Sequence, residues 1–221
     1  VSLPVWYLRF TFFNLRRMLM NKSFIIKIIV LCLVTIKVYA IEKVVLFGDS
    51  LMAGYGLSNE HHLSVVLKES LIADGFNIEV INGSVSGSTS SGGLNRAEWT
   101  LSESDVDLMI LGLGANDMLR GINPKETKKN LEQIIKIAQD KSIEVVLAGM
   151  VAPTSHGFKY KKNFDKIYPD LSKKYKLTLI PFLLEGVALK PKYNLSDGMH
   201  PNEKGTIIIS NTLKKAILNK L

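Results

Sequence analysis

A short apolar run that ends abruptly in small and polar residues is the feature that most constrains how this chain can fold. Residues Val44 to Phe47 are all apolar, two of the four are β-branched, and Gly48, Asp49 and Ser50 follow without a spacer. Such a run is typical of a strand buried on both faces of a parallel sheet. Polar residues at its end lie at the carboxyl edge, where open α/β folds bind ligands. Taken alone, a serine here could equally cap a helix.

The rest of the chain alternates strand-like runs with segments of helical periodicity. Further strands are predicted at residues 77–81, 106–111, 145–148 and 177–180. Helices are predicted around 63–71, 99–101, 124–138 and 160–175, and from Pro201 to the C-terminus. Pro169 must end or kink the fourth of these, and residues 82–93, rich in Gly, Ser, Thr and Asn, are predicted to form a long loop. Five strands separated by helices predict an α/β domain of three-layer α/β/α architecture with a five-stranded parallel sheet.

The first forty residues have a different character and are set apart from the fold. Basic Lys22 precedes an apolar centre that runs from Ile28 to Ile36, and small or modest side chains, Val38 and Ala40, follow. This layout predicts an upstream extension plus a secretory signal peptide in 1–40, cleaved after Ala40, and a single domain in 41–221. We therefore expect a bacterial periplasmic or secreted protein. A retained membrane anchor is the alternative, although a run of nine residues is short for a bilayer span.

The charge of the chain invites a nucleic-acid hypothesis that its distribution weakens. The formal net charge is +8, but residues 1–40 hold six basic residues and no acidic one. Residues 41–221 carry 22 basic and 20 acidic residues, mostly interspersed. No nucleic-acid partner is therefore expected. The single cysteine, Cys32, lies in the first segment, so 41–221 is predicted to form no disulfide and to use no thiolate.

Four polar segments follow the predicted strand ends, and in a parallel sheet they emerge at one edge. They contain Ser50 and residues 86–88, 114–117 and 197–200. Together they offer the groups that serine hydrolysis needs. Ser50 can act as the nucleophile and His200 as its base, while Asp197, three residues earlier, can orient the imidazole. Gly87 can present an unobstructed backbone N–H, Asn116 a side-chain amide, and Ser50 its own N–H to an oxyanion.

These blocks, in this order, resemble those of the SGNH (GDSL) hydrolase family. The matching residues are Gly48-Asp49-Ser50-Leu51, Gly87, Gly114-x-Asn116-Asp117 and Asp197-x-x-His200. The resemblance covers essentially all of 41–221 and implies a flavodoxin-like fold. It further implies a catalytic triad of Ser50, Asp197 and His200 and an oxyanion hole formed by Ser50, Gly87 and Asn116.

The same resemblance implies an activity. It predicts a serine esterase that hydrolyses acyl esters and thioesters, of the arylesterase, acyl-thioesterase and lysophospholipase type, with no metal and no cofactor. We expect a monomer that acts on small-molecule acyl esters or thioesters. It would meet a membrane only through an uncleaved signal or through lipid substrates.

Other interpretations of these residues stay open at this point. Asn116 and Asp117 could merely build a turn, and Asp49, adjacent to the serine, suits a turn-stabilising role better than that of triad acid. The same site could serve a deacetylase of surface polysaccharide, the crevice could belong to a non-catalytic lipid- or glycan-binding module, or the chain could be a membrane-anchored interaction protein. Phosphate-binding glycine motifs and a His-Glu-x-x-His zinc motif are absent, and Met52 stands where an α/β-hydrolase elbow has glycine.

Overall fold

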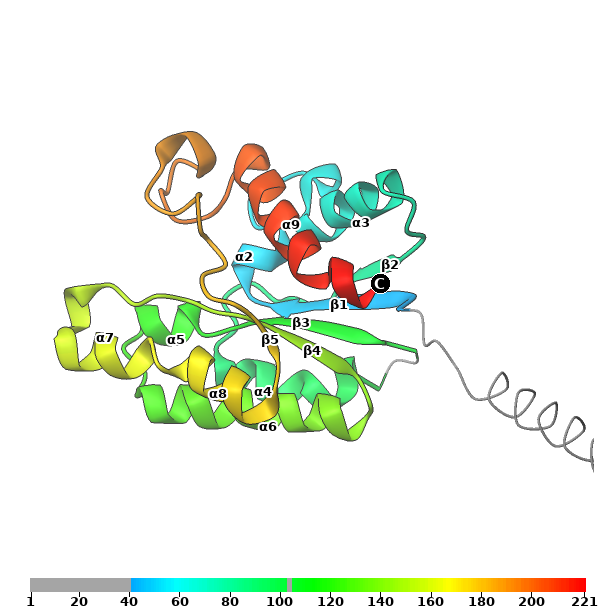
Figure 1. The fold of residues 1–221 in the computed structure, drawn as a ribbon. Coiled ribbons are helices and arrows are strands. Elements are labelled where there is room, and N and C mark those ends of the chain that lie inside the picture. The colour runs from blue at the N-terminus through cyan, green and yellow to red at the C-terminus, as the bar shows by residue number, and fades with distance from the viewer. Residues whose placement is uncertain (1–40, 103–104) are drawn as a thin grey trace, which may run out of the picture. The chain divides into compact units, whose positions relative to one another are not determined.

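The computed structural model describes residues 41–102 and 105–221, which form a parallel sheet between two layers of helices (Figure 1). The strands are β1 (Lys43–Gly48), β2 (Glu79–Asn82), β3 (Leu108–Gly112), β4 (Glu144–Ala148) and β5 (Thr178–Ile180). Their spatial order is β2-β1-β3-β4-β5, and every neighbouring pair is parallel. This is the flavodoxin-like order. The predicted three-layer α/β/α fold with a five-stranded parallel sheet is therefore confirmed.

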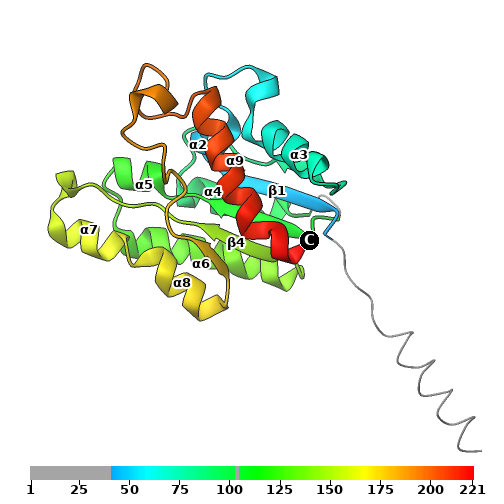
Figure 2. The same ribbon diagram turned by 45° about the horizontal axis from the view of Figure 1, so that its top comes forward.

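The long helices divide between the two faces of the sheet, as the two views in Figures 1 and 2 show. One face carries α3 (Leu63–Ala73) and α9 (Glu203–Ile217), and the other carries α4 (Ser90–Thr100), α6 (Pro124–Asp140) and α8 (Ile167–Tyr175). Three shorter helices follow strand ends: α2 (Ser50–Ala53), α5 (Ala115–Leu119) and α7 (Phe158–Phe164). Single 3₁₀ turns occur at Asn59–His61, Thr154–His156, Pro191–Tyr193 and Leu218–Lys220.

The core lies on both faces of the two central strands. Every residue of β3 and all of β1 except Lys43 are buried, and Val44 is in register with Leu108. Helices cover both faces, so these strands need no polar side and read as continuous apolar runs. Gly48 ends β1 where a Cβ would lie 2.5 Å from Met52 Sδ and 2.9 Å from the Gly112 carbonyl oxygen, so only glycine fits. The described residues of 41–221 thus hold a five-stranded sheet and one hydrophobic core, the features of a segment that folds by itself.

Several boundaries predicted from the sequence differ from the structure, and three of them have a clear local cause. The loop predicted for 82–93 is shorter, because Thr89 accepts a hydrogen bond from the Gly92 N–H and α4 begins at Ser90. The helix predicted for 160–175 is broken before Pro169, which occupies the third position of α8, where its missing N–H leaves no bond unmade. The last helix begins at Glu203 rather than at the predicted Pro201, with Asn202 as its N-cap.

The predictions for the signal peptide and its cleavage after Ala40 fall on residues 1–40, outside the described part of the chain. Among the residues that are described, no helix has both the length and the apolar character needed to cross a membrane.

Candidate active site

Ser50 is placed by the corner between β1 and α2. It is the first residue of α2, and Asp49 before it is the N-cap, with Oδ1 accepting a hydrogen bond from the Leu51 N–H at 3.1 Å. The chain leaves a buried strand and turns at once into a helix, so the Ser50 hydroxyl lies at the carboxyl edge of the sheet. The backbone N–H of Ser50 belongs to the first turn of the helix, whose N–H groups lack intrahelical partners.

His200 comes to this serine from a segment 150 positions later in the chain. Its Nε2 lies 2.9 Å from Ser50 Oγ, and its Nδ1 lies 2.7 Å from Asp197 Oδ2. An ionised carboxylate can only accept, so Nδ1 carries the hydrogen; in the neutral ring Nε2 is then the acceptor and the serine hydroxyl donates to it. The ring of Tyr55 packs against the imidazole, with centroids 4.3 Å apart.

Asp197 is held ionised by its own turn. Its carboxylate accepts hydrogen bonds from the backbone N–H of His200 at 3.0 Å and of Met199 at 2.8 Å, besides the imidazole. These bonds, the backbone ones first, lower the pKa of Asp197 to about 2. The turn is fixed in place by the Leu195 N–H, which donates to the carbonyl of His200, and by a bridge between Asn194 and Pro201.

The predicted donors for an oxyanion border the same cleft as Ser50 and His200. Gly87 has a φ of +77°, in the left-handed region that favours glycine, and its carbonyl accepts a hydrogen bond from Arg120 at 3.1 Å. Asn116, the second residue of α5, follows β3, the strand beside β1. Its Nδ2 donates to Asp49 Oδ2 at 3.3 Å, which leaves the second hydrogen of that amide free to face the cleft.

Asp49 contributes more to the site than the turn expected from the sequence. Its side chain is fully buried, and burial raises its pKa to about 6, although the bonds from Leu51 and Asn116 pull the other way. Because its two oxygens accept from the serine helix and from Asn116, it links the corner that holds the nucleophile to the amide on α5. The Gly48-Asp49-Ser50 sequence gave no signal for the second of these contacts.

Asp117 has the structural role that the turn hypothesis allowed. Its buried carboxylate accepts from the Ser90 N–H at 2.7 Å, from the Ser90 hydroxyl at 2.5 Å and from Thr127 at 3.1 Å. These bonds join the start of α4 to α6. They occupy the oxygens of the carboxylate, which does not line the cleft. Of the two neighbours in Gly114-x-Asn116-Asp117, only Asn116 borders the cleft.

Arg96 is a second contributor that sequence reasoning missed. Its guanidinium lies 3.9 Å from the centre of the Phe47 ring and donates to the carbonyl of Gly83 at 2.5 Å and of Gly48 at 3.0 Å. Arg96 therefore holds the end of β1, two residues before Ser50, next to the residue that follows β2. A single arginine in a polar helix carries no sequence signal of this contact, because it depends on residues far away in the chain.

The cleft beside Ser50 has a volume of about 310 Å³ and a mainly apolar wall. The large apolar side chains that line it include Met118, Leu119, Met150, Leu184 and Met199, from the segments that follow β3, β4 and β5. Met150 lies in the loop after β4, the one strand end that the sequence did not associate with the site. Such a wall suits a hydrocarbon chain attached to the reacting carbonyl. Within 41–102 and 105–221, no three His, Cys, Asp or Glu side chains gather where they could hold a metal ion.

The order of these residues is that of a known family. The sequence model of the GDSL-like lipase/acylhydrolase family matches residues 46–206, from β1 to the start of α9. The chain belongs to this family.

Similar proteins of this family are named as esterases or thioesterases. An arylesterase of Vibrio mimicus is 36% identical over 182 residues, 82% of this chain and 91% of the relative. The thioesterase 1/protease 1/lysophospholipase L1 of Escherichia coli (strain K12) is 33% identical over 187 residues, 85% of this chain and 88% of the relative. The crystal structure of AlinE4, an SGNH-hydrolase family esterase, superposes with a TM-score of 0.69 at 39% identity, covering 82% of this chain and 97% of that one. The protein is an ester hydrolase of this family, and the enzymatic interpretation is confirmed.

Proposed function

We propose that this esterase cleaves acyl esters and thioesters by means of a Ser50-His200-Asp197 triad. The observation that carries the proposal is the chain of two short contacts, 2.9 Å from Ser50 Oγ to His200 Nε2 and 2.7 Å from His200 Nδ1 to Asp197 Oδ2. Nucleophile, base and orienting carboxylate within hydrogen-bond reach form the arrangement that activates a serine hydroxyl.

The reaction has two halves. Ser50 Oγ attacks the acyl carbonyl carbon while His200 Nε2 takes the hydroxyl proton, and the tetrahedral intermediate collapses as His200 returns that proton to the leaving alcohol or thiol. Water then attacks the acyl-serine, His200 again takes and returns a proton, and a carboxylic acid and free Ser50 result. Asp197, held ionised by its turn, stabilises the imidazolium in both halves.

Three donors serve the oxyanion: the N–H groups of Ser50 and Gly87 and the amide of Asn116. Each borders the cleft, and Gly87, whose backbone is left-handed, has no side chain that could stand between its N–H and the substrate. Asp49 accepts one hydrogen of the Asn116 amide and thereby keeps the other directed to the cleft. Donors fixed in advance need no reorganisation when negative charge develops on the carbonyl oxygen.

The substrate class follows from the cleft wall and from the relatives. An arylesterase and a thioesterase 1/protease 1/lysophospholipase L1 are 36% and 33% identical to this chain over 82% and 85% of its length. The apolar wall can pack against the hydrocarbon of an acyl chain, whereas a sugar ring needs polar partners for its hydroxyl groups. The wall therefore supports the esterase hypothesis over deacetylation of polysaccharide. We further propose export by the signal in 1–40, cleavage after Ala40, and action as a monomer without a cofactor.

Replacement of the nucleophile tests the mechanism. We expect Ser50→Ala to lose turnover of p-nitrophenyl acyl esters by about 10⁶-fold and to lose covalent labelling by a fluorophosphonate, while its circular dichroism is unchanged. Ser91→Ala, at an exposed serine on α4, is the matched control and should behave like the parent. Normal turnover or labelling in Ser50→Ala would exclude the assigned nucleophile.

A further inference from the structure

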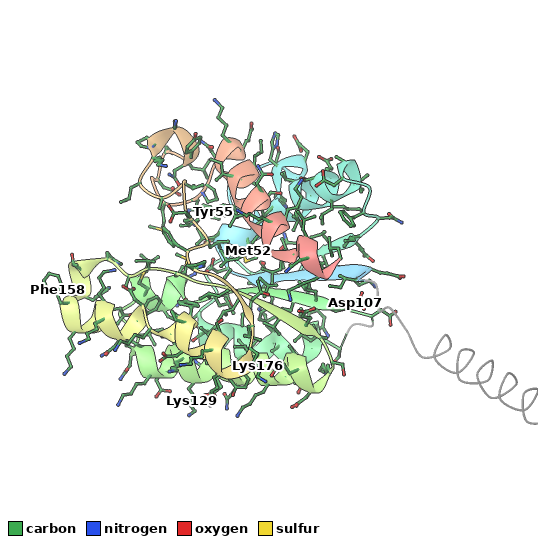
Figure 3. All side chains as sticks on the ribbon, in the orientation of Figure 1. Met52, Tyr55, Asp107, Lys129, Phe158 and Lys176 are labelled. Carbon is green, nitrogen blue, oxygen red and sulfur yellow. The ribbon has the colours of Figure 1, made fainter. Side chains whose placement is uncertain are left out.

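Two large apolar side chains protrude into solvent beside the segments that line the cleft. Phe158, the first residue of α7, is 81% exposed, and Figure 3 shows it at the tip of that helix. Leu189 is 93% exposed and lies in the segment 183–200, drawn in orange on the other side of the sheet edge in Figure 1. The same segment supplies Leu184, Met199 and His200 to the cleft.

Leu189 is exposed at a conformational cost. Its φ of +60° is uncommon for a residue with a bulky side chain, and Gly or Asn would occupy it with less strain. Almost all of the leucine surface faces water, so packing against the described residues does little to offset the backbone strain. A strained and exposed leucine is best explained by a contact with something outside the chain.

Phe158 stands on a helix that is firmly attached to the cleft region. Tyr160 donates from Oη to the carbonyl of Ile122 at 3.0 Å and stacks on buried Phe164. Ile122 lies three residues after Leu119, which lines the cleft. The exposed ring is therefore presented by a fixed element near the cleft and not by a loose terminus.

Basic side chains accompany both protrusions. Lys159 and Lys162 follow Phe158 on α7, with Lys162 one helical turn further on the same face, and Lys190 follows Leu189. All three are exposed, and none forms an ion pair with any residue in the described part of the chain. By contrast, Lys161 of the same helix is paired with Asp165 at 2.7 Å. The only acidic residue between 183 and 193 is Glu185, which is also exposed.

Trp99, an exposed apolar residue on another helix, lacks this setting. Trp99 is 70% exposed in the last turns of α4, on a helix that covers a face of the sheet, and its neighbour Glu98 is paired with Lys141 at 3.2 Å. A scattered exposed aromatic residue of this kind is ordinary for a soluble protein. Apolar tips that are followed by exposed lysines without an ion pair are instead the composition of surfaces that enter the boundary of an anionic bilayer.

We propose that Phe158, Lys159, Lys162, Leu189 and Lys190 form a docking surface, here called the edge patch, for an anionic lipid bilayer. The apolar tips enter the headgroup boundary, the lysines neutralise lipid phosphates, and the cleft between the two segments faces the membrane. The use of the patch, delivery of bilayer-borne acyl esters to Ser50, rests on the proposed function. The binding itself does not.

Vesicle sedimentation tests the edge patch with residues 41–221, which hold the whole sheet and core. The inactive Ser50→Ala chain serves as the background, so that docking is measured apart from catalysis. We expect binding to vesicles of phosphatidylglycerol and phosphatidylcholine that exceeds binding to pure phosphatidylcholine and weakens as salt is raised. Phe158→Ser and Leu189→Asn should each weaken binding about tenfold, and Lys159→Glu, Lys162→Glu and Lys190→Glu at least about fivefold each. Asn is chosen at 189 because it tolerates a positive φ.

Matched controls decide the outcome. Trp99→Ser removes a large apolar side chain that is 70% exposed on α4, outside the patch, and should change binding less than twofold. With Ser50 restored, every patch variant should hydrolyse soluble p-nitrophenyl acetate like the parent. Equal binding to the two kinds of vesicle, or equal loss in Trp99→Ser and Phe158→Ser, would overturn the proposal. So would a lipid-free dimer that Phe158→Ser dissociates, because the patch would then bind a second copy of the chain.

Discussion

Two carboxylates flank the reacting pair, and their surroundings are opposite. Asp49 is fully buried at the end of β1, where desolvation raises its pKa to about 6. Asp197 lies in an exposed turn, where backbone N–H groups and then the imidazole lower its pKa to about 2. The buried group braces the serine corner and the Asn116 amide, and the exposed one orients His200. Solvation, and not proximity to Ser50 in the sequence, separates the two roles.

Removal of the negative charge in the exposed turn should have the largest effect of those that follow. We expect Asp197→Asn to lower kcat by about 10⁴-fold, because an amide there favours the wrong imidazole tautomer and no longer stabilises the imidazolium. Steady-state hydrolysis of p-nitrophenyl esters measures the loss. Asp165→Asn, which removes a carboxylate that pairs with Lys161 and accepts from the Ala152 N–H, is the control. A loss below tenfold would point to another orienting group.

Truncation of Asn116, one of the proposed oxyanion donors, should have a smaller effect than the loss of the Asp197 charge. Asn116→Ala removes one of three proposed donors, and we expect kcat to fall about 10²–10³-fold with little change in KM. An unchanged kcat would show that the amide does not face the developing charge. Asn130→Ala, which removes an amide bonded to Ser90 away from the cleft, provides the comparison.

The two carboxylates should also affect stability with opposite dependence on pH. The pKa of Asp49 is raised from 3.8 to about 6, so the folded state loses stability as pH rises from about 4 to about 6, by up to about 3 kcal/mol. Relative to the parent, Asp49→Asn should therefore gain free energy of unfolding across that window. The lowered pKa of Asp197 contributes stability that is present above pH 4 and lost toward pH 2. Below pH 4, the free energy of unfolding of Asp197→Asn should therefore rise relative to that of the parent. Urea unfolding at several pH values measures both, and parallel curves would contradict the assignments.

The smallest effect tests whether the buried carboxylate acts through Asn116. In Asp49→Asn, the Leu51 N–H still requires the side-chain oxygen, so an amide N–H₂ faces the Asn116 N–H₂. Asn116 must turn, and we expect kcat to fall about tenfold at pH 8 with KM unchanged. In the Asn116→Ala background the same substitution should change kcat little. Additive losses in the double variant would mean that Asp49 acts by another route.

Much of the fold could be predicted because its signals are local. Val44 to Phe47 and the run at 145–148 are apolar throughout, and both are central, buried strands. Prediction failed where a side chain decided a boundary. Thr89 caps α4 at residue 90 inside a stretch whose composition favours a loop, and Asn202 rather than Pro201 starts the last helix.

The site could be predicted in outline for a related reason. Parallel strands bring all their following segments to one edge, so Ser50, Gly87, Asn116 and His200 were expected near one another, and all four border one cleft. The contacts of Arg96 with the ends of two strands, and the contribution of Met150 after β4, had no counterpart in any motif.

The sequence by itself therefore determined the layer architecture, the family and the set of polar side chains at the edge, since apolar periodicity and residue order are properties of neighbours along the chain. Only the tertiary structure decided which carboxylate is buried, which hydrogen of the Asn116 amide is free, and where lysines stand unpaired beside exposed apolar tips. The physical reason is that desolvation and hydrogen-bond geometry are set by residues brought together from distant segments, and neither is encoded in any one of them.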